Sequence, residues 1–132
     1  VALGIAGWER AKERPRAYEH IVEAAAAKHG IDPNLLFAVM RVESVYQKRI
    51  LSYAGAVGLM QIMPRTGRLI AHQLGRDDYT TADLLDPATN IEFAAWYLSS
   101  LIDRLSTNPL LSSLLRHLLF RGGRMSRPTE SL

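Results

Sequence analysis

The chain has 132 residues, of which 48% are hydrophobic and 22% charged, and this balance suits one globular domain with a real core. It contains no cysteine, which excludes a disulfide framework and a thiolate nucleophile. Its apolar runs are far shorter than the roughly 20 residues that a membrane-spanning helix needs. The formal charge of +3 gives only a weak preference for an anionic partner.

The first residues, VALGIAG, have no positively charged stretch before them, so they do not resemble an export signal. The chain begins with Val1 rather than methionine, which leaves open whether a signal or a further domain precedes it. We therefore expect no information on localisation from this end. Residues 1–15 are expected to form a charged lead-in to the first helix.

Two helices are predicted in the first third of the chain. Residues 16–29 repeat apolar side chains three or four apart, and Gly30 follows at a typical helix end. Asp32 is the predicted N-cap of the second helix, and Pro33 is its predicted first residue. Apolar side chains at helical spacing continue this helix through Leu35, Leu36, Val39, Val42 and Tyr46.

The middle of the chain is predicted to hold one helix between two irregular segments. The periodicity fails over residues 47–58, where glycine and serine predict a loop or an irregular hairpin. A third helix is expected over about residues 64–74, with Gly75 at its end. The turn-rich stretch RDDYTTADLLDP then predicts a connection with one short helical turn.

The longest predicted helix begins at Asp86 and Pro87, which repeat the capping signature of the second helix. Its apolar face comprises Ile91, Ala94, Ala95, Leu98, Leu101, Ile102 and Leu105. Asn108 and Pro109 end it, and leucine pairs predict a fifth amphipathic helix over residues 110–120. No segment alternates with the period of two that marks a strand. The sequence therefore predicts an all-α domain with about five helices.

One acidic residue interrupts the apolar pattern of the second helix. Glu43 lies seven residues after Leu36 and four after Val39, which predicts that its carboxyl lies on the inward stripe. A carboxyl beside apolar surface favours its neutral form, and general-acid cleavage of a glycosidic bond requires a neutral carboxylic acid. By spacing alone, pairing with a surface base such as Lys48 or Arg49 is the other interpretation.

The string around Glu43 is more specific than its spacing. The pair ES is followed by Ser52, nine residues after the glutamate, and then by AGAVGLMQIMP. This pattern closely resembles the lytic transglycosylase domain of the soluble, goose-lysozyme-like type, and DLLDPATNIEFAAWYL resembles a later segment of the same family. The resemblance covers about residues 18–105. It implies a lysozyme-like (goose-type) helical fold, with residues 16–108 as the catalytic domain.

The resemblance implies cleavage of the β-1,4 bond between N-acetylmuramic acid and N-acetylglucosamine in peptidoglycan, with formation of a 1,6-anhydromuramoyl end. Glu43 falls on the family's catalytic glutamate. It would protonate the leaving oxygen and then take the proton of the muramic acid 6-hydroxyl, which closes on C1. The nucleophile belongs to the substrate, so the second carboxyl of an ordinary glycosidase is not required.

The resemblance also implies substrate-binding residues. Ser52 matches a serine whose hydroxyl contacts the substrate, and Gln61 and Met63 match glycan-contacting positions. Tyr97 belongs to the later segment and is a further candidate for the cleft. By residue type alone, Ser52 also fits a turn and Met63 fits core packing, while Asn90 and Tyr97 fit packing and local hydrogen bonding.

The four histidines are dispersed and form no metal-ligand motif, and the glycines form no phosphate-binding loop. We therefore expect no metal and no cofactor. The resemblance implies that the partner is the peptidoglycan glycan strand, that envelope-complex proteins are a second class of partner, and that nucleic acid is not a partner. It also implies the periplasm or cell envelope of a bacterium.

The resemblance stops before the chain does. The family usually continues with a segment reading Ala-Ala-Tyr-Asn-Ala-Gly-Pro-Gly, whose tyrosine approaches the catalytic glutamate. Residues 109–132 have no such segment and carry the apolar helix and a polar tail instead, and Lys48 stands where the family commonly has proline. Three alternatives stay open: a muramidase that uses water, a non-catalytic peptidoglycan-binding module, and an interaction protein that docks through its leucine-rich segment.

Overall fold

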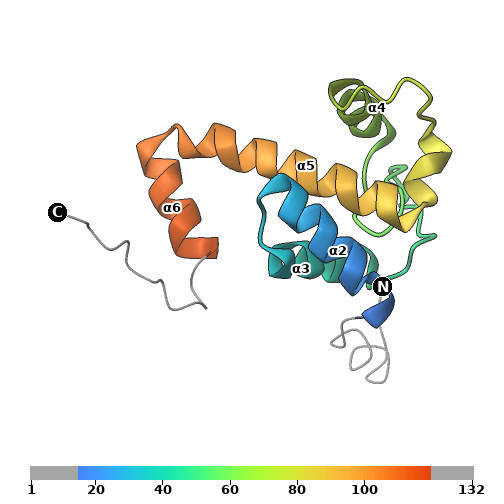
Figure 1. The fold of residues 1–132 in the computed structure, drawn as a ribbon, viewed down its shortest axis with the longest axis horizontal. Helices are drawn as coiled ribbons and strands as arrows, with labels where there is room; N and C mark the ends of the chain where they lie inside the picture. Colours follow the sequence, from blue (N-terminus) through green and yellow to red (C-terminus); the bar gives the residue numbers. More distant parts are fainter. Residues whose placement is uncertain (1–14, 120–132) are drawn as a thin grey trace. The chain divides into compact units, whose positions relative to one another are not determined.

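The structure is a computed structural model that describes residues 15–119, with side-chain surroundings as far as Leu114. Most of the predicted lead-in and the polar tail, residues 1–14 and 120–132, lie outside the described residues. Within 15–119 the regular elements are all helical, which confirms the all-α prediction (Figure 1). They are α2 (Arg16–His29), α3 (Pro33–Ser44), α4 (Pro64–Gln73), the 3-10 helix η1 (Thr81–Leu85), α5 (Pro87–Ser106) and α6 (Pro109–Leu119). Contacts divide the chain between Ser99 and Ser100, and the two parts are described in turn.

Short-range capping signals start the helices where the sequence predicts. The Asp32 carboxylate accepts a hydrogen bond from the backbone N–H of Asn34 at 2.8 Å, directly ahead of α3. Asp86 has the same role before α5, where its Oδ2 accepts from the backbone N–H and the hydroxyl of Thr89, each at 3.0 Å. Gly30 ends α2 with a φ of 64°, a conformation that glycine adopts without steric cost.

The end of α3 differs from the prediction. The helix stops at Ser44, two residues before the predicted end at Tyr46. Val45 and Tyr46 adopt φ values of 51° and 62°, in the left-handed region that a β-branched residue rarely occupies. The N–H of Val45 bonds to the carbonyl of Arg41 at 3.1 Å and closes the last turn. The chain therefore reverses immediately after Glu43.

The irregular hairpin predicted over residues 47–58 is present. Antiparallel bridges join Leu51 to Val57 and Val57 to Ile62, so three short segments lie side by side without forming a regular strand. The predicted helical turn is η1, which opens with a reciprocal capping box between Thr80 and Asp83.

The core of residues 15–99 draws on every helix of that part. The helix α2 lies beside α3 (Figure 1), and α4 packs on η1. The large side chains with almost no exposure are Val22, Leu36, Met40, Leu59, Ile70, Leu84, Ile91 and Phe93. Burial of such side chains is the main favourable term in folding, so this core fixes the positions of the loops around it.

A charged cluster ties α2 to α5. Lys28 Nζ donates to Glu92 Oε1 at 2.5 Å, and His29 Nε2 lies 3.5 Å from the same oxygen. Burial alone would raise the pKa of Glu92, but the hydrogen bond and charge of Lys28, together with His29, outweigh it and lower that pKa. The Ser99 hydroxyl adds a hydrogen bond to the carbonyl of His29 at 2.8 Å.

Residues 100–119 comprise the end of α5 and all of α6, whose presence confirms the fifth predicted helix. Asn108 Oδ1 caps α6 by accepting from the backbone N–H groups of Leu110 and Leu111 at 3.1 and 3.3 Å. The side chains of Leu110 and Leu114 are exposed, the former to 83%. Among the described helices, including the 20-residue α5, none combines the length and apolarity needed to cross a bilayer.

Candidate active site

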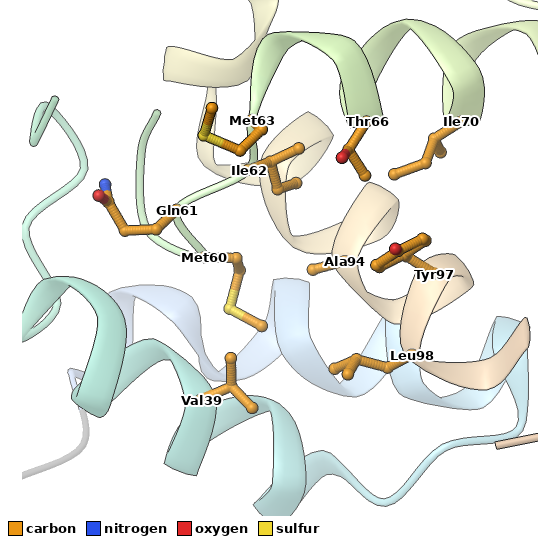
Figure 2. Close-up of a pocket in the computed structure, with 10 residues that line it drawn as sticks. All are labelled: Val39, Met60, Gln61, Ile62, Met63, Thr66, Ile70, Ala94, Tyr97 and Leu98. Atoms are coloured by element: carbon orange, nitrogen blue, oxygen red, sulfur yellow. The ribbon is translucent and has the colours of Figure 1, made fainter. Parts of the chain in front are cut away.

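A pocket of about 250 Å³ opens beside the loop that follows the hairpin (Figure 2). Side chains from α3, from the loop, from α4 and from α5 converge on it, as Figure 2 shows. Its lining is mainly apolar and comprises Val39, Met60, Gln61, Ile62, Met63, Thr66, Ile70, Ala94, Tyr97 and Leu98. An apolar concavity with a few polar groups on its wall is the usual form of a ligand site.

Asn90 holds the loop against α5. Its Oδ1 accepts from the backbone N–H of Met60 at 2.7 Å, and its Nδ2 donates to the carbonyls of Val57 at 3.0 Å and Leu84 at 2.8 Å. The side chain is fully buried. These three bonds hold the backbone at Met60, Val57 and Leu84 in place, because breaking any one of them leaves a buried polar group unsatisfied. The packing role expected of Asn90 is confirmed, but its hydrogen bonds are not local, because two of them reach residues 30 and 33 positions away.

Gly58 permits this close approach. Its φ is 78°, and a Cβ built there would lie 2.5 Å from both Asn90 Nδ2 and the Leu84 carbonyl oxygen. Neither neighbour is the free end of a flexible side chain. A glycine is therefore required here both by backbone conformation and by space.

Gln61 lines the pocket and also clamps the hairpin. Its Nε2 donates to the carbonyls of Ile50 at 3.0 Å and Gly58 at 2.8 Å, so both amide protons bond to backbone. Its φ of 49° lies in the left-handed region, which costs energy for a residue with a Cβ. Gln61 is thus held firmly at the pocket wall, and its predicted glycan contact stays a prediction.

The other three predicted binding residues fall in two places. Met63, 41% exposed, and the half-buried Tyr97 both line the pocket with Gln61. Ser52 does not line the pocket. Its Oγ accepts from the backbone N–H of Ala56 at 2.8 Å and closes the hairpin turn, which is the turn role that its residue type also allowed.

Glu43 is exposed, and the prediction that its carboxyl lies on the inward stripe is wrong. The buried face of α3 runs through Leu36, Phe37, Met40 and Ser44. The helix ends and the chain reverses at Val45, so no further segment of the described chain covers Glu43 at this end. Residues four apart on a helix are neighbours, with Cβ atoms roughly 5–6 Å apart, and Val39 lines the pocket. Glu43 therefore lies one turn beyond the pocket wall, on the solvent side.

Aromatic and cation–π contacts next to α4 are not predicted by any pattern in the sequence. Gly67 lies against the Tyr79 hydroxyl, the rings of Tyr79 and Phe93 are 5.3 Å apart, and the Arg76 guanidinium lies 5.5 Å above the Phe93 ring. Burial of its hydroxyl raises the pKa of Tyr79 above the usual value. These contacts orient α4, and no local motif in the sequence announces them.

Within the described residues, no group of three or more His, Asp or Glu side chains is arranged to hold a metal ion. The candidate site comprises an apolar pocket wall, with the exposed Glu43 one helical turn from Val39 of that wall.

The site thus lies in an all-helical domain, where a loop and three helices line one apolar pocket. The sequence pattern of the family described as "Transglycosylase SLT domain" matches residues 20–115, and the chain belongs to this family.

Curated relatives carry the same domain within longer chains. The membrane-bound lytic murein transglycosylase C of Actinobacillus pleuropneumoniae is 41% identical over 92 residues, which are 68% of this chain and 25% of that protein. The protein of the same name from Haemophilus influenzae is 39% identical over 87 residues, or 64% of this chain and 24% of its own. This chain thus spans about a quarter of the length of the curated relatives it matches.

Solved structures share the fold. The 70 kDa soluble lytic transglycosylase of Escherichia coli superposes with a TM-score of 0.68 and 32% identity, over 82% of this chain and 18% of that one. An inactive mutant of the lytic transglycosylase Slt of Pseudomonas aeruginosa, in which a glutamate is replaced by glutamine, gives a TM-score of 0.66 and 31% identity over 76% of this chain and 16% of that one. The lysozyme-like fold predicted from the sequence is confirmed.

Proposed function

We propose that this domain is a peptidoglycan lytic transglycosylase in which Glu43 is the acid and base. The observation that carries the proposal is the position of Glu43, one helical turn beyond the pocket wall at Val39, in a chain of the transglycosylase SLT family. The Pseudomonas aeruginosa relative with a glutamate-to-glutamine change is described as inactive, which supports an essential glutamate in this fold.

The proposed reaction needs only one protein carboxyl. Glu43 as the acid protonates the glycosidic oxygen that leaves N-acetylmuramic acid, and the C1–O bond breaks. As the carboxylate it then accepts the proton of the muramic acid 6-hydroxyl while that oxygen bonds to C1. The carboxyl is regenerated, and the products are a 1,6-anhydromuramoyl end and a free N-acetylglucosamine hydroxyl. General acid–base help of this kind is typically worth roughly 10²- to 10⁴-fold in rate.

In the free protein the Glu43 carboxyl is exposed to water, and in this proposal the bound substrate supplies the apolar surroundings. A glycan strand lying across Glu43 removes water from it and stabilises the neutral acid that the first step needs. In this proposal Gln61, Met63 and Tyr97 contact the strand along the pocket wall. Ser52 contributes through the hairpin turn that its hydroxyl closes.

The domain division is also a proposal. Residues 1–15 form a lead-in, residues 16–108 form the catalytic domain, and residues 109–132 form a divergent helix and tail. Peptidoglycan glycan strands are the proposed partner, with proteins of an envelope complex as a second class. The relatives described as membrane-bound support a location in the bacterial envelope, and the periplasm is our specific proposal.

One observation favours a second function. The sequence has no counterpart of the family's Tyr-Asn segment, which approaches the catalytic glutamate. A domain without it retains the pocket and binds glycan without cleaving it. A muramidase, which uses water and leaves a reducing end, is the third outcome.

The experiment incubates the purified chain with intact sacculi and identifies the released muropeptides by mass, because the anhydro product is one water lighter than the hydrolysis product. Glu43→Gln is expected to lower release roughly 10²- to 10⁴-fold. Its melting temperature should not change, since the side chain is exposed. Glu23→Gln, an exposed glutamate on α2, is the matched control and should leave release unchanged.

Equal release by Glu43→Gln and the parent chain contradicts the role of Glu43. Release of reducing ends in place of anhydro ends identifies a muramidase. Binding to sacculi without release by the parent chain identifies the non-catalytic module.

A further inference from the structure

An aromatic side chain stands fully exposed at the tip of the hairpin, which we define as residues 50–57. Tyr53 has a relative exposure of 110%, and Leu51 on the same hairpin is 68% exposed. Val42 and Met63 are also exposed large apolar side chains. A single exposed apolar residue is ordinary. Here four of them lie between positions 42 and 63, the stretch of sequence that contains Glu43 and the loop of the proposed site.

The turn that presents Tyr53 is closed by three hydrogen bonds. The N–H of Ser52 donates to the carbonyl of Ala56 at 2.9 Å, the N–H of Gly55 donates to the carbonyl of Ser52 at 2.9 Å, and the Ser52 hydroxyl accepts from Ala56. The backbone under Tyr53 is therefore ordered before any ligand arrives. Since tyrosine has only two side-chain torsions, it can present its ring to a ligand at low entropic cost.

The base of the hairpin is joined to the pocket wall. The carbonyl of Ile50 accepts from the N–H of Gly58 at 2.8 Å and from Nε2 of Gln61, the pocket residue labelled in Figure 2. The base of the hairpin and the pocket wall are therefore held together at Gln61.

The charge of this segment has one sign. From Ser44 to Arg76 the sequence contains no acidic residue, and its five cationic residues are Lys48, Arg49, Arg65, Arg68 and Arg76. Lys48 and Arg49 immediately precede the hairpin and are exposed. Exposed cations such as Lys48 and Arg49 attract anionic ligands and hold them more weakly as salt rises.

We propose that the hairpin is a second contact surface for the glycan strand and selects strands that carry peptides. The ring of Tyr53 packs on the apolar face that the axial C–H groups of a pyranose present. Lys48 and Arg49 bind carboxylates of a peptide attached to a neighbouring sugar. The identity of the ligand rests on the proposed function. An aromatic flanked by cations also suits single-stranded nucleic acid, but the glycan is favoured because the hairpin adjoins the pocket of a transglycosylase-family domain.

The test measures binding in the Glu43→Gln chain, so that cleavage does not consume the ligand. The probes are chitotetraose, which is an uncharged sugar, and soluble glycan strands with and without peptides. Tyr53→Ala should weaken binding of all three about tenfold, and Tyr53→Phe should keep it within about twofold. Lys48→Gln with Arg49→Gln should leave chitotetraose binding unchanged and weaken the peptide-bearing strand several-fold. The peptide-free strand, whose only carboxylates are the lactyl groups of N-acetylmuramic acid, should be weakened less, and most of the salt dependence should disappear. Arg16→Gln, an exposed cation on α2, is the matched control.

A site-specific readout separates this proposal from the catalytic one. The aromatic NMR signals of Tyr53, assigned by comparison with Tyr53→Phe, should shift on addition of chitotetraose. If they shift while the parent chain releases nothing from sacculi, the contact surface stands and the catalytic proposal fails. Unchanged Tyr53 signals and unchanged affinity of Tyr53→Ala overturn the contact surface. Binding of a single-stranded oligonucleotide, lost in the same variants, without binding of any glycan probe, overturns it as well.

Discussion

The first half of α5 and the helix α6 have the same kind of sequence and different surroundings. Both repeat apolar side chains at helical spacing, and both begin at an Asx-Pro capping signal. In α5 the residues Ile91, Ala94 and Ala95 are buried, whereas in α6 the leucines 110, 111 and 114 are exposed. Amphipathic spacing therefore predicts that a helix forms, and it does not predict that its apolar face is covered.

Hydrogen bonds account for part of the contrast. Asn90 stands inside the apolar face of α5 and bonds to backbone groups as far away in sequence as Val57. The side-chain oxygen of Asn108, at the start of α6, accepts from Leu110 and Leu111 of the helix that it caps. An anchored polar group specifies one packing arrangement, while a cap stabilises a helix in any arrangement.

Among the proposed substitutions, Asn90→Ala should lower the free energy of unfolding the most. It leaves the N–H of Met60 and the carbonyl of Leu84 without their partner in a buried place, and we expect a loss of about 3–4 kcal/mol of unfolding free energy. Denaturant unfolding measures it. Asn108→Ala is the matched control and should cost about 1 kcal/mol or less. Equal losses in the two variants would mean that Asn90 is no more than a local cap.

Gly58→Ala should have the next largest effect. The new methyl meets Asn90 Nδ2 and the carbonyl oxygen of Leu84 at 2.5 Å, and the backbone φ of 78° adds strain. We expect a cost of about 2–3 kcal/mol in thermal or denaturant unfolding. Gly55→Ala separates the two causes, because its φ is 94° and open space surrounds the added Cβ, so only about 1 kcal/mol is expected. If both variants lose the same amount, the close approach to Asn90 contributes nothing.

The smallest effect should come from Leu110→Ser combined with Leu114→Ser. These side chains are 83% and 55% exposed, so the unfolding free energy of the monomer should change by less than about 0.5 kcal/mol. Gel filtration at two concentrations, before and after the change, tests whether the leucines join copies of the chain. A large drop in melting temperature for a monomer would contradict the exposure of Leu110 and Leu114.

The features that the sequence predicts well depend on neighbouring residues. Gly30 and the pairs Asp32-Pro33 and Asp86-Pro87 act within one turn of the helices that they delimit, and these boundaries are confirmed. The family string from Glu43 onward predicts the fold because it carries more information than any spacing rule, and the family match confirms that inference.

The features that the sequence misses depend on distant residues. The burial of Glu43 was inferred from helical spacing alone, but the early end of α3 at Ser44 leaves it exposed. The side chain of Gln61, whose φ is positive, bonds to nearby Gly58 and also to Ile50 across the hairpin, and the second of these contacts cannot be read from neighbouring residues. Gly67 lies against Tyr79, and Tyr79 lies against Phe93. Neither the helical nor the strand periodicity of the sequence predicts that these residues are close together.

The bonds of Asn90 also set an order of events during folding. They join positions separated by 30 and 33 residues, so they cannot form until the start of α5 has returned to the loop. Closing such a span has an entropic cost that local helices do not bear. During synthesis from the N-terminus, the loop at residues 58–62 therefore cannot make its bonds to Asn90 until the start of α5 has been made.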